Sequence, residues 1–288
     1  MLFYDIMNYN YPEDKDYFSI NKDLLKHIKN KPNKKKHLSN NISRYVDFIK
    51  KYQKIFKYIP FIKSVYISNS ISFKSVHNKS DIDLFIVIEN NRLHIWRLIT
   101  KILLHLMQIE WNHLPWKFCT WFWVTEQSVD LYPIIISPID IYLAYWIAHL
   151  QPIYSISEKN MYKIYEQNKR VKEIIPNYNY KPKNIININP IIWTSYIKKM
   201  LEKFLSFNFL NVLIWKFRKI KMLYKQKKSI IKKKDLIISD DMLKFFSPDI
   251  RKIVYLKYKS LQNNKFQNNK SIKFNIKNLN KKKFESLF

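Results

Sequence analysis

Two different spacings of hydrophobic positions run along the chain. Short apolar stretches with alternating faces predict strands at residues 65–67, 82–88, 117–124 and 129–136. Apolar residues spaced three and four apart predict helices at residues 13–30, 38–58, 91–108, 140–149, 158–173 and 191–224. This mixture predicts an α/β (α+β) fold in which a small mixed sheet is flanked by helices.

The predicted strand 82–88 is apolar on both faces, which indicates a sheet covered on both sides. Two acids, Asp81 and Asp83, stand at its start and project from the same side, because side chains two apart on a strand share a face. Neighbouring carboxylates repel each other unless a cation lies between them, and Mg²⁺ is the usual cation where phosphates are handled. The alternative is a strand that begins with two solvated aspartates.

The segment NSISFKSVHNKSDIDLFIV, residues 69–87, resembles the signature of the nucleotidyltransferase superfamily, the DNA polymerase β-like fold. That signature is a strand, a Gly-Ser turn that opens a helix, and a second strand bearing Asp-x-Asp. The chain is most similar in character to small bacterial nucleotidyltransferase-domain proteins. The specific motif covers roughly 25 residues, and a weaker similarity extends to about residue 178.

The resemblance implies a transferase that moves a nucleotidyl group from an NTP such as ATP to the hydroxyl of an unknown acceptor. It implies that Asp81 and Asp83 are the catalytic metal ligands and hold Mg²⁺, with two ions in an active enzyme. It further implies that the nucleotide phosphates are bound by four residues around the turn and the loop: Asn69, Ser70, Lys79 and Ser80.

The sequence departs from the family pattern at two places. Asn69 replaces the turn glycine, and asparagine is the best non-glycine residue for a left-handed backbone. The family's third carboxylate is absent from the predicted strand 117–124, and only Glu126 and Asp130 follow it. A catalytically degenerate nucleotide-binding protein is therefore the second interpretation.

The chain has 288 residues, a formal net charge of +30 and no glycine. Such a charge raises affinity for any polyanion, so a basic module that binds nucleic acid or a membrane surface is a third interpretation. Nucleic acid is the weaker prediction, because the surplus is mostly lysine and arginine is the residue that reads phosphates and bases bidentately. The single cysteine, Cys119, is expected to be a small buried group.

Histidines are expected to be structural. His149 is predicted to pack within its helix, and His94 and His105 to lie on a solvated helix face with Arg97 and Lys101.

The pattern divides the chain into an N-terminal helical region (1–60), a nucleotidyltransferase-like core (61–137), a helical appendage (138–225) and a basic low-complexity tail (226–288). The tail is expected to be poorly ordered, or helical only within 240–259. No apolar run reaches the roughly 20 residues of a membrane span. The N-terminus lacks a signal-peptide pattern, so a cytoplasmic location is expected.

Overall fold

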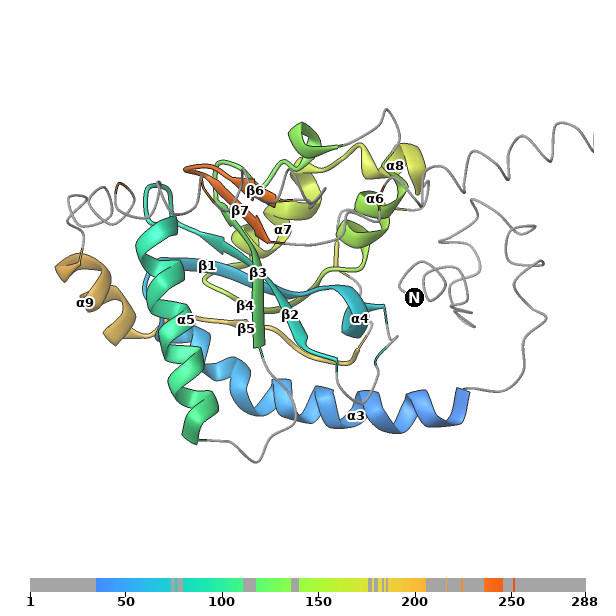
Figure 1. The fold of residues 1–288 in the computed structure, drawn as a ribbon, viewed down its shortest axis with the longest axis horizontal. Helices are drawn as coiled ribbons and strands as arrows, with labels where there is room; N and C mark the ends of the chain where they lie inside the picture. The colour runs from blue at the N-terminus through green and yellow to red at the C-terminus, as the bar shows by residue number, and fades with distance from the viewer. Residues whose placement is uncertain are drawn as a thin grey trace, which may run out of the picture.

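The computed structural model describes residues 35–73, 76, 80–110, 118–135, 140–175, 178, 181, 182, 184, 186–205, 216, 224, 236–245 and 251. Within them the protein is a mixed α/β structure in which a seven-stranded mixed sheet is flanked by helices (Figure 1). The predicted fold class is confirmed.

The strands of the sheet follow the order β5-β4-β1-β2-β3-β7-β6. At its centre β1 pairs antiparallel with β2, and β2 pairs parallel with β3. β4 and β7 flank this group, each antiparallel to its inner neighbour. The strand bounds are β1 Ile62–Ile67, β2 Ile82–Ile88, β3 Phe118–Thr125, β4 Gln151–Ser155, β5 Ile191–Ile192, β6 Leu236–Ile238 and β7 Met242–Phe245.

Helices cover both faces of the sheet (Figure 1). Buried residues of α3 and α5 join one apolar cluster, and buried residues of α6, α7 and α8 join the other. The helix bounds are α3 Lys35–Tyr52, η2 Gln53–Lys57, α4 Asn69–Ser72, α5 Leu93–Glu110, η3 Tyr132–Ile134, α6 Ile141–Ala148, α7 Glu158–Gln167, α8 Val171–Ile174 and α9 Tyr196–Phe204.

The two faces of β2 enter different clusters, as the sequence predicts. Leu84, Ile86 and Ile88 pack on the α3 and α5 side, whereas Phe85 and Val87 pack on the α6 side. Because Asp83 shares its face with Phe85, the acid belongs to the α6 side of the sheet. The strand therefore fixes which helices can approach the carboxylate.

Several predicted elements are confirmed with shifted bounds. α3, α5, β1, β2 and β3 lie where the pattern placed them, and Asp140 caps α6 by accepting a hydrogen bond from the Leu143 amide at 2.9 Å. The helix expected at 158–173 is interrupted at Asn168, whose side chain bonds the backbone of Val129, Leu131 and Ile164 instead. The helix expected at 13–30 lies outside the described residues.

Three predictions are wrong. Residues 129–136 contain the short helix η3 rather than a strand, and residues 191–192 form strand β5 before α9 begins. Strands β6 and β7 occupy residues 236–245, where an irregular or helical tail was expected. They form because Leu243 and its neighbours on β7 pair with the edge of β3. Strand β4 was not anticipated, because Pro152 lies inside it.

The prediction that α5 has a solvated face is also wrong in part. His105 is exposed, but His94 is only 3% exposed, and its Nε2 lies 4.0 Å from Asp240 Oδ1. The acid comes from the turn between β6 and β7, so the unexpected strands bring a carboxylate close to this histidine. No helix in the described part of the chain is both long and apolar enough to cross a membrane.

Candidate functional site

A left-handed turn joins β1 to α4 at Asn69. The residue has φ 56°, and its side chain is 1% exposed. Most residues avoid this backbone region, and asparagine tolerates it best after glycine. Asparagine therefore supplies the left-handed residue of this turn in a chain that contains no glycine.

The side chain of Asn69 connects the turn to the acidic strand. Its Nδ2 donates to Asp83 Oδ2 at 2.9 Å, and its Oδ1 accepts from Trp146 Nε1 at 3.1 Å and from Tyr142 Oη at 3.5 Å. A glycine could make none of these bonds. Asn69 thus holds Asp83 on one side and α6 on the other.

A second set of bonds fastens the backbone of the same turn. The Ser68 amide donates to the Asp83 carbonyl at 3.0 Å, and Trp121 Nε1 on β3 donates to Ser68 Oγ at 3.2 Å. The turn is thereby tied to β2 and β3 as well as to α6. This fixes the position of Ser70, which is half-buried and directly follows Asn69.

Burial dominates the ionisation of Asp83. The pKa of this carboxyl is raised from 3.8 to about 6, chiefly by burial and in smaller part by the nearby charge of Asp81. Hydrogen bonds from Asn69 and Cys119 act in the opposite direction. A cation beside the two acids would favour the charged form of Asp83, because it would compensate both the desolvation and the repulsion.

The other predicted site residues are placed as follows. Asp81 is exposed, just before β2, and close enough to Asp83 to interact electrostatically. The Ser80 carbonyl accepts a hydrogen bond from Tyr45 Oη on α3 at 2.9 Å. Lys79 lies outside the described residues. The structure therefore brings together Asn69, Ser70, Asp81 and Asp83 at one end of β2.

A thiol, and not a third carboxylate, lies opposite Asp83 on the neighbouring strand. β3 runs parallel to β2 with Cys119 opposite Asp83, and the thiol hydrogen-bonds the carboxylate. Glu126 cannot serve instead, because its amide bonds the Ile88 carbonyl at the far end of β2. Ile88 lies five positions after Asp83, or about 16 Å along the strand. Cys119 is half-exposed and part of the site, which differs from the buried apolar role expected for it.

The two acids could hold a magnesium ion whose remaining ligands would come from substrate phosphates and water. No group of three or more His, Cys, Asp or Glu side chains that could hold a metal occurs in the described ranges. Mg²⁺ nevertheless binds commonly through one or two carboxylates together with phosphates and water. Asp81 and Asp83 supply such a donor set.

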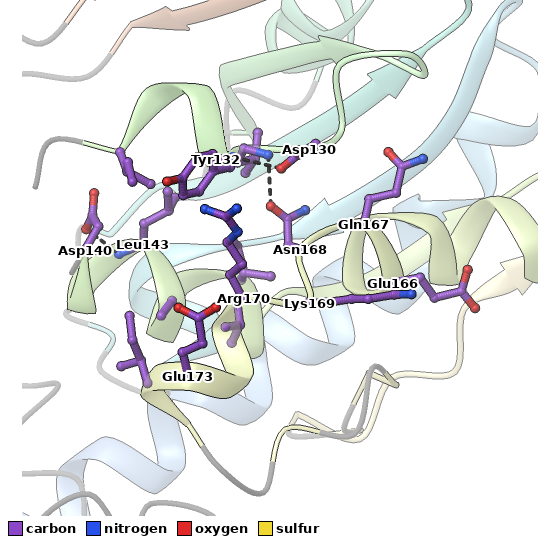
Figure 2. A pocket seen from close by; sticks show the side chains of 16 residues that line it. Asp130, Tyr132, Asp140, Leu143, Glu166, Gln167, Asn168, Lys169, Arg170 and Glu173 are labelled. Carbon is purple, nitrogen blue, oxygen red and sulfur yellow. Dashed lines mark hydrogen bonds between the residues drawn. The ribbon is translucent and has the colours of Figure 1, made fainter. Parts of the chain in front are cut away.

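A separate cavity of about 750 Å³ lies beyond α6 (Figure 2). Asp130 lines it, and Arg170 reaches over the ring of Tyr132 at 3.7 Å. Leu143 and Ile147 of α6 face this cavity, whereas Tyr142 and Trp146 face Asn69. A helix about 10 Å wide therefore separates the cavity, and Asp130 with it, from the acidic pair.

Sequence reasoning did not identify Tyr142, Trp146, Trp121 or Ser68 as parts of this site. The bonds that the three aromatic side chains donate join residues more than 50 positions apart, as in the bond from Trp121 to Ser68. His149 was predicted correctly as a packed residue, since its Nδ1 lies 2.7 Å from the Tyr145 carbonyl.

Comparison with known proteins gives no relative. No protein-family model matches the chain, and no curated protein or solved structure matches it at a significant level.

Proposed function

We propose that this protein is a magnesium-dependent nucleotidyltransferase. The observation that carries the proposal is the 2.9 Å hydrogen bond between Asn69 Nδ2 and Asp83 Oδ2. It joins the turn that would receive phosphate to the strand that would hold the metal. A nucleotide could span both only if they lie together, and a site with Ser70 across the sheet from the acids would exclude the reaction.

Each residue has a distinct role in this proposal. Ser70 and the backbone amides of its turn would receive the outer phosphates of the nucleotide. Asp81 and Asp83 would hold Mg²⁺, which supplies charge neutralisation along the triphosphate. Trp146 and Tyr142 would keep Asn69, and through it Asp83, in one orientation. The acceptor hydroxyl would attack the α-phosphorus, and pyrophosphate would leave.

The thiol of Cys119 supports a second candidate, which is a nucleotide-binding protein without turnover. In the family pattern a third acid helps to position and activate the attacking hydroxyl. A thiol opposite Asp83 cannot supply a hard oxygen ligand for magnesium. The two candidates share binding and differ in catalysis.

Calorimetric titration with each of the four ribonucleoside triphosphates and Mg²⁺ tests nucleotide binding, which both candidate functions require. We expect saturable binding that requires Mg²⁺ and is lost in Asp81→Asn and Asp83→Asn. Asp47→Asn is the matched control, because Asp47 is an exposed acid on α3. Binding that survives both site substitutions would contradict the proposal.

Release of pyrophosphate then separates an enzyme from a binding protein. We expect pyrophosphate to appear from the preferred nucleotide, and intact mass spectrometry would detect any nucleotidyl group attached to the protein itself. Tight binding with no pyrophosphate, over a panel of sugars, proteins and nucleic-acid ends as acceptors, would favour the degenerate protein.

A further inference from the structure

Helix α9 packs on the protein through its polar side. The Lys198 side chain is 1% exposed, and its Nζ donates to the Ile62 carbonyl and to Tyr154 Oη. Glu202 Oε1 accepts from the Phe61 amide at 2.6 Å. Burial lowers the pKa of Lys198 to about 7, as expected for an ammonium group removed from water. These bonds fix which side of α9 faces the sheet.

The opposite side of α9 presents large apolar side chains to solvent. The exposed fractions are 54% for Trp193, 75% for Tyr196, 57% for Ile197, 57% for Met200 and 76% for Phe204. The helix stands at the periphery of the molecule (Figure 1). A contiguous apolar strip of this kind marks an interaction surface, because a soluble helix normally turns such residues inward.

Positive charge surrounds this strip. Lys199 and Lys203 are exposed on the same helix, and Lys57 of η2 lies over the Trp193 ring at 5.0 Å. The one acid of α9, Glu202, is bonded to the protein backbone instead. Neither α9 nor η2 carries another acid.

We propose that this strip, from Trp193 to Phe204 with its flanking lysines, docks on an anionic lipid bilayer. Below it is called the α9 face. Helices that lie in the membrane interface bury Trp, Phe and aliphatic side chains and place lysines at the headgroups. Trp and Tyr are preferred at that depth because their rings are amphipathic. The net charge of +30 adds long-range attraction to such a surface.

Charge and side-chain type favour lipid over other partners. Two copies of a chain with net charge +30 would repel each other, so a second copy is a poor occupant. Ile197 and Met200 offer nothing to phosphates or base edges, and the face contains no arginine. The inference is independent of the nucleotidyltransferase proposal, since α9 and the acidic pair share no residue.

A fluorescent probe on the helix tests the proposal directly. Cys119 is the single cysteine, so Cys119→Ser combined with Met200→Cys allows one environment-sensitive dye to be attached on the α9 face. The same dye on Ile102→Cys is the matched control, because Ile102 is 49% exposed on α5. Vesicles of phosphatidylcholine with and without phosphatidylglycerol are the probes.

We expect a blue shift and brighter emission at position 200 with the anionic vesicles only, and no change at position 102. Equal shifts at both positions, or none at position 200, would overturn the proposal. Single-stranded RNA that produces the same shift at position 200 would overturn it as well, and would assign the face to nucleic acid.

Vesicle flotation separates the α9 face from the general basicity of the chain. We expect Met200→Gln with Phe204→Gln to weaken binding about tenfold, because two apolar side chains leave the interface. Ile102→Gln with Leu103→Gln, which also changes two exposed apolar residues, should bind as the unmodified protein does. Circular dichroism would verify that all variants fold. Unchanged binding in the α9 variant would show that charge elsewhere holds the vesicles, and the proposal would fail.

Discussion

At the scale of single residues, Asn69 performs two tasks at once. Its backbone accepts the left-handed conformation of the turn, and its amide bonds Asp83, Trp146 and Tyr142. Glycine would satisfy the backbone alone. Asparagine at this position therefore adds a fixed link between the turn and the acidic strand that glycine would lack.

Asp83 gives the first prediction. Because folding raises its pKa from 3.8 to about 6, the folded state binds the proton more tightly than the unfolded state. The contribution of this group to stability is therefore greatest at low pH and falls as the pH rises through that range. Asp83→Asn removes the ionisation, and we expect it to stabilise the protein above pH 6 by on the order of 1–3 kcal/mol.

Urea denaturation of both proteins in magnesium-free buffer between pH 4 and pH 8 measures this effect. The difference in unfolding free energy between the variant and the unmodified protein should grow across the interval and then level off. Asp47→Asn, which changes an exposed acid, should give a flat difference. A flat difference for Asp83→Asn would show that its carboxyl is not desolvated.

At the scale of elements, the sequence predicts what depends on local pattern. The two faces of β2 follow from its own alternation, and the cap of α6 follows from Asp140 alone. β4 carries a proline that argues against a strand, and β6 and β7 are short and lie in a lysine-rich region. β4 pairs with β1, β7 with β3 and β6 with β7. This pairing overrides the local signals, and a single sequence does not display it.

The candidate site also combines residues that local sequence predicts with residues that depend on distant parts of the chain. Asp81, Asp83 and the Asn-Ser turn were predictable because they lie in one short segment that resembles a known motif. The aromatic residues that hold Asn69 come from α6, more than 70 positions later. Nothing in their local sequence distinguishes them from core residues.

The register of β3 on β2 gives the second prediction. Because Cys119 is opposite Asp83 on a parallel neighbour, Cys119→Asp would place a third carboxylate beside the acidic pair. We expect tighter Mg²⁺ binding and faster pyrophosphate release, by about tenfold or more, since the added ligand positions the metal. Without Mg²⁺ the variant should be less stable, because three acids would repel one another.

Cys119→Asn is the matched control, because an asparagine side chain has nearly the same shape as aspartate but carries no charge. A pyrophosphate assay and a thermal melt with and without Mg²⁺ would compare both variants with the unmodified protein. Equal behaviour of Cys119→Asp and Cys119→Asn would show that this position does not face the metal.

At the scale of the whole molecule, the β6–β7 pair extends the sheet beyond β3. It covers an edge that would otherwise expose unpaired backbone groups of β3. It also brings Asp240 toward His94 of α5, and Asp241 bonds Thr125 at the end of β3. A segment assigned to the tail on composition therefore belongs to the core of the fold.

Leu243 tests this conclusion. Its side chain is fully buried, at 0% exposure, within the same apolar cluster as Trp123 and Ile86. We expect Leu243→Ala to lower the unfolding free energy by about 2–4 kcal/mol, through lost burial and the cavity left behind. Leu103→Ala is the matched control, because Leu103 is 39% exposed, and it should cost less than about 0.5 kcal/mol. Urea denaturation compares the unfolding free energies of the two variants. Equally small decreases in both would mean that the β6–β7 pair is dispensable. Truncating a buried leucine must lower the unfolding free energy if its strand completes the sheet.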